Sequence, residues 1–273
     1  MRLALILLLA ITLANAEFLI DRVDVAISDI KSDGSARVHE SIKFVMFGNY
    51  SNSVYDSGIT NNELSFWSNN TGLKDAKIHV NPVKVDIRDF RLRPQPRTKC
   101  NPIQGICHGE LILDYLAYPS YNNTTSSIQP DTGLFRISRY KPRTMRYTIN
   151  PSALSFTTTP EGNIILDENV FLTIKLPAES VTLDANPQPT GTDVVLPSHV
   201  DSLSWSGIVL VKFSLIFDVE ESIDKEVSDF FSNIILSVTN ALGGPHGIAL
   251  VVLIAVLIGS YLYIMMSKRR GEE

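Results

Sequence analysis

The chain has 273 residues, and its 29 acidic side chains outnumber its 24 basic ones to give a formal net charge of −5. This balance lacks the strong positive charge of a typical nucleic-acid-binding protein, so we expect no nucleic-acid partner. The sequence contains no P-loop, dinucleotide-binding, HExxH or GxSxG motif, so we expect no cofactor and no enzymatic activity.

Residues 1–16 are expected to form a secretory signal peptide. Arg2 precedes an apolar run from Leu3 to Leu13, and small residues stand at Ala14 and Ala16. This pattern is typical of a cleaved export signal and is too short for a permanent membrane span. The mature chain would then begin at Glu17 and face an extracytoplasmic compartment. An uncleaved signal anchor is the alternative.

The stretch from Asp29 to Glu40 matches most of the sequence pattern of a calcium-binding EF-hand loop. It places Asp at loop positions 1 and 5, Gly at 6 and Glu at 12. Position 3 needs an oxygen ligand but holds Lys31, and both flanks alternate apolar and polar residues as strands do. We therefore predict a β-hairpin that turns at Gly34, with no metal bound.

Glu40 breaks the polar–apolar alternation of this hairpin. It stands between Val38 and Ile42 in the inward-facing phase, which predicts a buried carboxylate. Such a group needs a hydrogen-bonding partner or a raised pKa. The hypotheses are a structural acid with its hydrogen bonds satisfied or, less commonly, a functional acid.

Further short runs typical of strands follow along the chain, and turn residues separate them. They occupy residues 76–80, 83–87, 110–115, 134–138, 145–149, 163–166, 170–176 and 208–217. No useful helical periodicity precedes residue 220. The pattern predicts a mostly β, β-sandwich-like ectodomain. It forms either one large domain or two small β-rich regions, residues 17–150 and 151–221.

The C-terminal part predicts one amphipathic helix and one membrane span. Residues 222–244 carry apolar side chains at helical spacing and end in a Gly-Gly-Pro linker. This helix packs on protein or lies in the membrane interface. Residues 248–266 carry no charge, which predicts a transmembrane helix, and the basic residues of the tail, 267–273, favour a cytoplasmic C-terminus. The expected location is the cell membrane, single-pass, with the N-terminal domain outside.

Two kinds of covalent modification are expected outside the cell. Cys100 and Cys107 are the only cysteines, and a close pair in an oxidising compartment predicts a disulfide. Four Asn-x-Ser/Thr sequons predict glycosylation on solvent-facing loops. They lie at Asn49, Asn69, Asn122 and Asn123.

Ten of the 24 basic residues fall into two clusters, which form the candidate binding surface. The first contains Arg88, Arg91, Arg93, Arg97 and Lys99, and the second contains Arg136, Arg139, Lys141, Arg143 and Arg146. One interpretation is a solvated strand face balanced by acids elsewhere. The other is a surface for acidic envelope polymers, lipid headgroups or an acidic partner, which is favoured if the clusters are adjacent.

The hairpin from Val23, with its motif Asp33-Gly-Ser-Ala-Arg-Val-His-Glu-Ser-Ile-Lys-Phe44, is followed by Phe47-Gly-Asn-Tyr50. It resembles the opening of the exported region in a family of uncharacterised prokaryotic membrane proteins, with the pattern DGSxxVxExIxF. The resemblance implies a signal peptide, a β-rich extracytoplasmic domain and a membrane helix. The long or multi-span C-terminal region frequent in that family is not found here. Because the family has no assigned reaction, the resemblance implies architecture and location only.

These features together predict a single-pass cell-surface protein that acts by binding, as a receptor or an accessory subunit of an envelope or membrane assembly. Its expected partners are the lipid bilayer and either a protein or an envelope polymer outside the cell. One alternative is an adhesion or polymer-binding module that uses the basic clusters. The other is a membrane-tethered hydrolase whose catalytic residues meet only in the fold.

Overall fold

The computed structural model describes residues 17–220, apart from 73–75, 102, 123–126, 130 and 192–193, together with Ser232. The predicted signal peptide, transmembrane helix and tail lie outside the described residues, as does the amphipathic helix apart from Ser232. No helix within the described part is long and apolar enough to cross a bilayer. The residues described up to Glu220 belong to one compact unit, which is mostly β.

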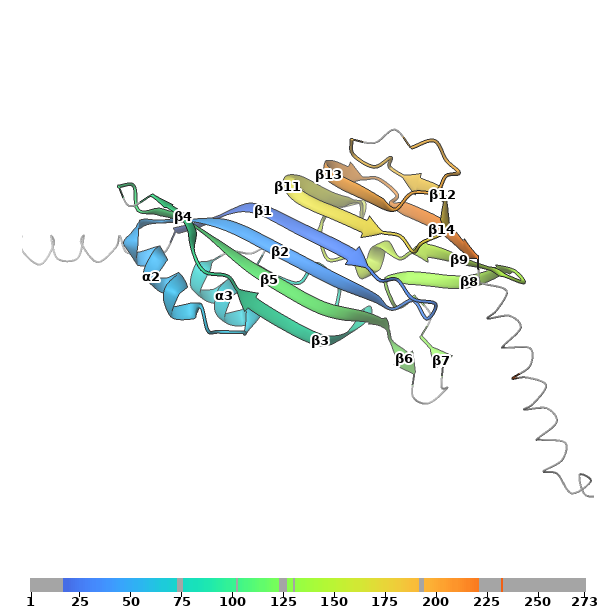
Figure 1. The fold of residues 1–273 in the computed structure, drawn as a ribbon, viewed down its shortest axis with the longest axis horizontal. Helices are drawn as coiled ribbons and strands as arrows, with labels where there is room; N and C mark the ends of the chain where they lie inside the picture. The colour runs from blue at the N-terminus through green and yellow to red at the C-terminus, as the bar shows by residue number, and fades with distance from the viewer. Residues whose placement is uncertain are drawn as a thin grey trace, which may run out of the picture. The chain divides into compact units, whose positions relative to one another are not determined.

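A large sheet of eight strands organises this unit (Figure 1). Its strands are β1 (Glu17–Ser28), β2 (Ala36–Phe47), β3 (Val85–Pro94), β4 (Thr98–Asn101), β5 (Ile106–Pro119), β10 (Thr157–Thr158), β11 (Ile164–Lys175) and β13 (Ser202–Leu210). The order is β10-β11-β1-β2-β5-β3, with β13 also on β11 and β4 also on β5. The predicted β1–β2 hairpin is confirmed, whereas β1 and β11 run parallel.

A second sheet has four strands in the order β12-β14-β9-β8. They are β8 (Phe135–Lys141), β9 (Thr144–Ile149), β12 (Ser180–Asn186) and β14 (Ser214–Glu220); β6 (Tyr121–Asn122) and β7 (Ser127–Ile128) form a separate pair, and Pro151–Ala153 is a 3-10 turn. Because β11 pairs with β1 and β14 pairs with β9, strands from before and after residue 150 share both sheets. The two predicted β-rich regions are thus interleaved.

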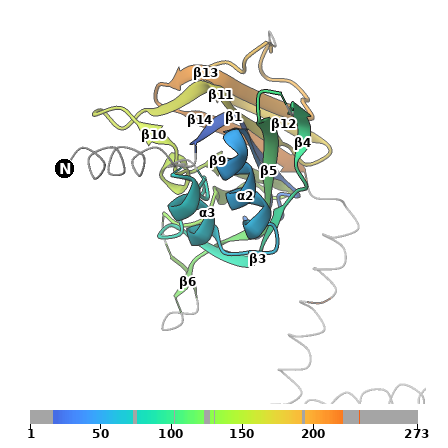
Figure 2. The ribbon, with the colours of Figure 1, turned by 90° about the vertical axis from the view of Figure 1, so that its left-hand side faces the viewer.

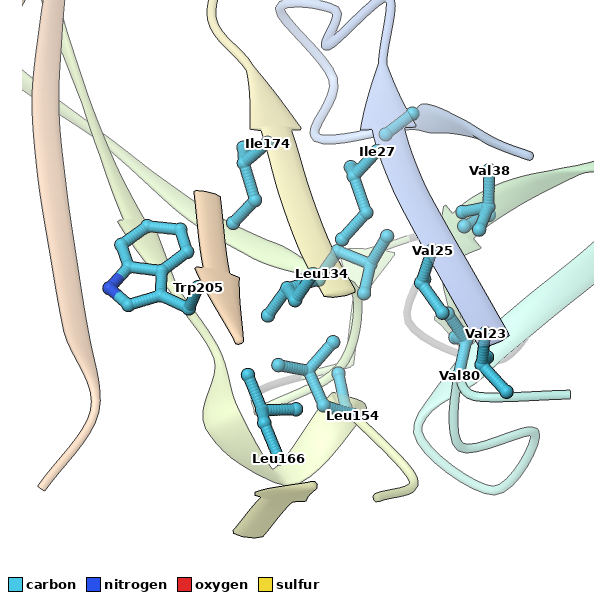
Figure 3. Close-up of a cluster of buried hydrophobic side chains, with 14 of the residues drawn as sticks. Val23, Val25, Ile27, Val38, Val80, Leu134, Leu154, Leu166, Ile174 and Trp205 are labelled. Carbon is cyan, nitrogen blue, oxygen red and sulfur yellow. The ribbon is translucent and has the colours of Figure 1, made fainter. Parts of the chain in front are cut away.

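The inward side chains of the two sheets form one apolar core. Figure 3 shows Ile27 of β1, Ile174 of β11 and Trp205 of β13 near Leu134, which stands just before β8. All four side chains are fully buried. Alternation along the strands sends every second side chain inward, and removing that apolar surface from water is the main force that holds the sheets together.

Two helices interrupt the β pattern before residue 220, where the sequence has no useful helical periodicity. They are α2 (Gly48–Gly58) and α3 (Leu64–Thr71), side by side at one end of the large sheet (Figure 2). Their sequences are rich in Ser and Asn and carry no apolar stripe. Each instead buries one aromatic ring, Tyr55 or Trp67, and these rings lie 5.3 Å apart. Tertiary packing therefore sets these helices, not local periodicity.

Four predicted strands also differ from the structure. Residues 76–80 are not a strand; only Val80 forms a bridge, to Leu154, because the backbone N–H of His79 is hydrogen-bonded to the side chain of Glu40 and not to a neighbouring strand. The run 208–217 is divided between β13 and β14 by a turn at Lys212, whose φ is +50°. The runs 163–166 and 170–176 belong to the single strand β11, which is irregular between Leu166 and Phe171.

The disulfide prediction is confirmed: Cys100 of β4 is bonded to Cys107 of β5. Cys107 is buried, and the bond fixes the short β4 strand to the edge of the large sheet. Among the sequons, Asn49 on α2 and Asn69 on α3 are exposed. Asn123 and the side chain of Asn122 lie outside the described residues, and glycosylation stays a prediction.

Gly109 of β5 allows α2 to pack closely on the sheet. A Cβ atom there would lie 2.7 Å from a ring carbon of Phe44 and 2.8 Å from one of Tyr55. We expect Gly109→Ala to lower the free energy of unfolding by about 1–3 kcal/mol, because two packed rings must move.

Urea unfolding followed by tryptophan fluorescence measures this effect, since both tryptophans, Trp67 and Trp205, are fully buried. The control is Ala26→Val on the half-buried outer face of β1, which should change stability by no more than about 0.5 kcal/mol. Equal effects of the two substitutions would contradict the packing argument.

Candidate functional sites

The stretch that resembles a calcium loop directs its three acids, Asp29, Asp33 and Glu40, to different partners. Asp33 accepts hydrogen bonds from the backbone N–H and hydroxyl of Ser35, at 2.9 and 2.6 Å, and thereby closes the hairpin turn. Asp29 pairs with Arg37 at 3.0 Å. Glu40 points into the core instead. The stretch therefore forms a turn whose acids have unrelated partners.

The first candidate site is a groove on the outer face of the large sheet. Strand alternation points Arg37 of β2 and Asp114 of β5 outward, and an irregularity of β3 between Arg88 and Arg91 widens the surface beside them. The groove has a volume of about 370 Å³ and is lined by Arg37, Asp89, Arg91, Arg93, Asp114, Tyr115 and Leu116. We refer to it as the arginine groove.

Asp114 partly neutralises the arginine groove. Asp114 accepts a hydrogen bond from His39 Nδ1 at 2.7 Å and another from Arg93. Burial raises the pKa of Asp114, but the bonds from His39 and Arg93 outweigh it and leave the pKa below its usual value. Arg91 is exposed and forms no ion pair with any described residue. One cationic side chain of the groove therefore remains available to an acidic ligand.

The rest of the first cluster points elsewhere. Arg88 pairs with Asp86 at 2.7 Å, and Arg97 forms two bonds to Asp56 on α2, at 2.7 and 2.8 Å. Lys99 is exposed on β4. The first cluster thus contributes only Arg91 and Arg93 to the arginine groove, and Arg37 joins them from outside it.

The second cluster lies on β8, β9 and the turn between them, in the other sheet. Arg136 pairs with Asp131 at 2.6 Å and Arg146 with Asp218 at 2.8 Å. Of the others, Arg139 donates to the carbonyl of Pro142, Lys141 lies near the ring of Tyr140, and Arg143 is half-buried. The first cluster belongs to the large sheet and its edge, so the two clusters lie in different sheets.

The second candidate site surrounds Glu40, which is fully buried. Its Oε1 accepts hydrogen bonds from the backbone N–H of His79, at 3.0 Å, and from the hydroxyl of Tyr115. Its Oε2 lies 2.8 Å from His79 Nδ1. Burial, the charge of Glu40 and the bond to it raise the pKa of Tyr115 well above its usual value. The prediction of an inward acid at Glu40 agrees with this geometry.

Sequence reasoning missed His79 and Tyr115, the two partners of Glu40. They stand 39 and 75 residues away along the chain, and residues 76–80 read as an ordinary strand. The sequence offered one indication of these partners: a buried carboxylate needs hydrogen-bond donors. That rule shows that partners exist but does not choose them among the histidines, tyrosines and serines of the sequence.

A small cavity lies next to His79, beside β11 and the two strands β1 and β10 that pair with it. Its volume is about 90 Å³. It is lined by Ile20, Val23, Lys77, His79, Phe156, Thr157, Ile165, Asp167, Asn169 and Val170. The rings of His79 and Phe156 are 5.2 Å apart. The fold therefore places a histidine, joined to a buried carboxylate, at the wall of a partly polar cavity.

Comparisons with known proteins give no family. No family model matches the chain, and no curated protein matches it significantly. The NMR structure of the folded domain of Mycobacterium tuberculosis LppM is 14% identical over 76% of this chain and 92% of that one, with a TM-score of 0.25. Yeast LTA4 hydrolase in complex with bestatin is 8% identical over 74% of this chain and 29% of the hydrolase, with a TM-score of 0.26. Scores this low carry no argument about activity.

We expect Tyr115→Phe to destabilise the protein by about 1–3 kcal/mol, because the buried carboxylate of Glu40 loses a donor. It should also change the response to alkali. The raised pKa of Tyr115 keeps it protonated in the native state, whereas an unfolded tyrosine ionises near about pH 10. The stabilising contribution is therefore present below that pH and is lost as the pH rises above it.

Urea unfolding at about pH 8 and about pH 10.5 tests both effects. The wild type should lose more stability between the two values than Tyr115→Phe does. Tyr118→Phe is the control, since Tyr118 is half-buried on the outer face and its substitution should cost no more than about 0.5 kcal/mol. Parallel losses in all three proteins would show that the hydroxyl of Tyr115 does not stabilise the fold.

Proposed function

We propose that this chain is a single-pass membrane protein whose β-sandwich-like ectodomain binds an acidic partner through the arginine groove. In this proposal the partner is part of an envelope or membrane assembly, and the chain serves it as a receptor or accessory subunit. The exported topology rests on the signal peptide and apolar span expected from the sequence. The resemblance to uncharacterised prokaryotic membrane proteins supports the same architecture.

The observation that carries the proposal is the exposed guanidinium of Arg91 within a groove of about 370 Å³. Most other members of the basic clusters have a neighbouring acid or a ring contact, which leaves them less charge to offer a ligand. Arginine also binds carboxylates with two parallel hydrogen bonds, which makes it more selective for carboxylates than lysine is. A groove with Arg37, Arg91 and Arg93 therefore fits a carboxylate-rich surface.

The alternative of a module that binds an extended envelope polymer through both clusters has less support. The clusters lie in different sheets, and five of their ten members are paired with acids within the described residues. A membrane-tethered hydrolase is favoured by one observation, the contact of His79 with Glu40 beside a cavity. A carboxylate-oriented imidazole is a common general base, but no nucleophile is identified beside it.

Binding of poly-L-glutamate to the full chain in detergent micelles tests the groove. Arg91→Glu should weaken this binding by roughly tenfold, because an attractive contact becomes repulsive. The loss should diminish at high salt, which screens exposed charges. Arg136→Glu, on the other sheet, is the matched control and should bind as the wild type does.

Equal losses from Arg91→Glu and Arg136→Glu would favour the polymer-binding alternative instead. No loss from either would remove the arginine groove as the binding surface. Proximity labelling from the ectodomain in cells then identifies the neighbours, and those that depend on Arg91 are the candidate partners.

The proposed topology predicts that an epitope inserted after residue 17 is cleaved by protease added to intact cells, because the ectodomain lies outside. An epitope placed after residue 273 should be protected until the membrane is permeabilised. Protection of the first epitope in intact cells would contradict an exported ectodomain and, with it, the proposed receptor function.

A further inference from the structure

His79 is held rigidly by its backbone as well as by its ring. Its carbonyl accepts a hydrogen bond from the N–H of Ser155 at 2.8 Å, and its own N–H is bound to Glu40. The neighbouring residue Val80 bridges to Leu154. The segment is thus fixed on both sides of the histidine, so the imidazole has a defined position at the cavity wall.

The contact with Glu40 fixes the orientation of the imidazole. An ionised carboxylate can only accept hydrogen bonds, so Nδ1 of His79 is the donor to an ionised Glu40. The other ring nitrogen, Nε2, has no hydrogen-bond partner among the described residues, and His79 lines the cavity. In a ring that carries both protons, Nε2 is a donor as well and can bind an anion in the cavity.

Lys77 supplies a positive charge to the same cavity. It forms no ion pair with a described residue and is half-buried. Asn169 already donates its amide to the carbonyl of Ile20 at 3.4 Å. The acid of the cavity, Asp167, is exposed to solvent, where water reduces its repulsion. The charges that face inward therefore favour an anionic group between His79 and Lys77.

The remaining walls are apolar and narrow. Val23, Ile165, Val170 and Phe156 line the space next to His79 and Lys77. A volume of about 90 Å³ has room for several water-sized groups. A metal ion fits less well, because the described residues contain no group of three or more His, Cys, Asp or Glu side chains able to hold one, and Lys77 adds positive charge.

We propose that this cavity binds a small molecule with one carboxylate and a short aliphatic chain. The carboxylate lies between the imidazole of His79 and the ammonium group of Lys77, and the aliphatic part lies against Val23, Val170 and Phe156. Glu40 is a positioning residue that orients the imidazole. This site is separate from the arginine groove and does not depend on the proposed receptor function.

Titration of the full chain in detergent micelles with sodium propionate tests the site, with methyl NMR as the readout. The methyl signals of Val23, Ile165 and Val170 should shift in a saturable manner, whereas those of Val83 and Val195, which are 82% and 83% exposed, should not. Propionamide, the neutral isostere, should cause no saturable shift. Uniform shifts of all five residues, or equal binding of propionamide, would overturn the proposal.

Two substitutions at the cavity test its charge. Lys77→Met keeps the aliphatic stem and should weaken propionate binding by roughly fivefold, because an ion pair is lost. Asp167→Asn should strengthen binding, because a nearby negative charge is removed. Unchanged affinity in Lys77→Met, or weaker binding in Asp167→Asn, would contradict the assignment.

Arg91→Glu should leave propionate binding unchanged, and Lys77→Met should leave poly-L-glutamate binding unchanged. The two sites can therefore fail independently. Loss of propionate binding in Arg91→Glu would place the anion in the arginine groove and overturn the cavity site.

Discussion

The described fold depends on accommodating one carboxylate in the middle of its largest sheet. Glu40 sits at the centre of β2, which lies between β1 and β5, and a bare charge there would be very costly. Its donors come from β5 and from the segment that carries His79. That segment also contacts residues 153–155 through its backbone. One hydrogen-bonded acid thus ties together three parts of the chain that are distant in sequence.

This arrangement also separates the two faces of the sheet by their chemistry. Inward side chains form the apolar core and the Glu40 network, whereas outward ones carry the paired charges around Asp114. The adjacent residues Asp114 and Tyr115 illustrate the division, since one faces His39 and Arg93 while the other faces Glu40. A single strand therefore contributes to the arginine groove and to the wall of the core at successive positions.

The strands with clear alternation could be predicted from the sequence, because period-two patterning reflects a sheet with one buried face. The β1–β2 hairpin, the inward position of Glu40 and the disulfide follow from such local rules. Helices α2 and α3 could not be predicted, since their stability comes from burying Tyr55 against β5 and Trp67 against Tyr55. Nor could the partners of Glu40, because strand order, not spacing along the chain, decides which donors reach it. The basic clusters were visible as composition, but only the fold shows which arginines are already paired.

The parallel pairing of β1 with β11 has a consequence for how this protein is made. Val23 of β1 and Val170 of β11 are neighbours in the sheet. During synthesis β1 therefore emerges first, and the edge that pairs with β11 stays uncovered until most of the domain has been made. Until then β1 exposes unpaired backbone groups, which are prone to pairing with other chains. Contacts between such distant segments also slow folding. A nascent chain that ends before β11 would therefore be bound by chaperones or degraded by proteases.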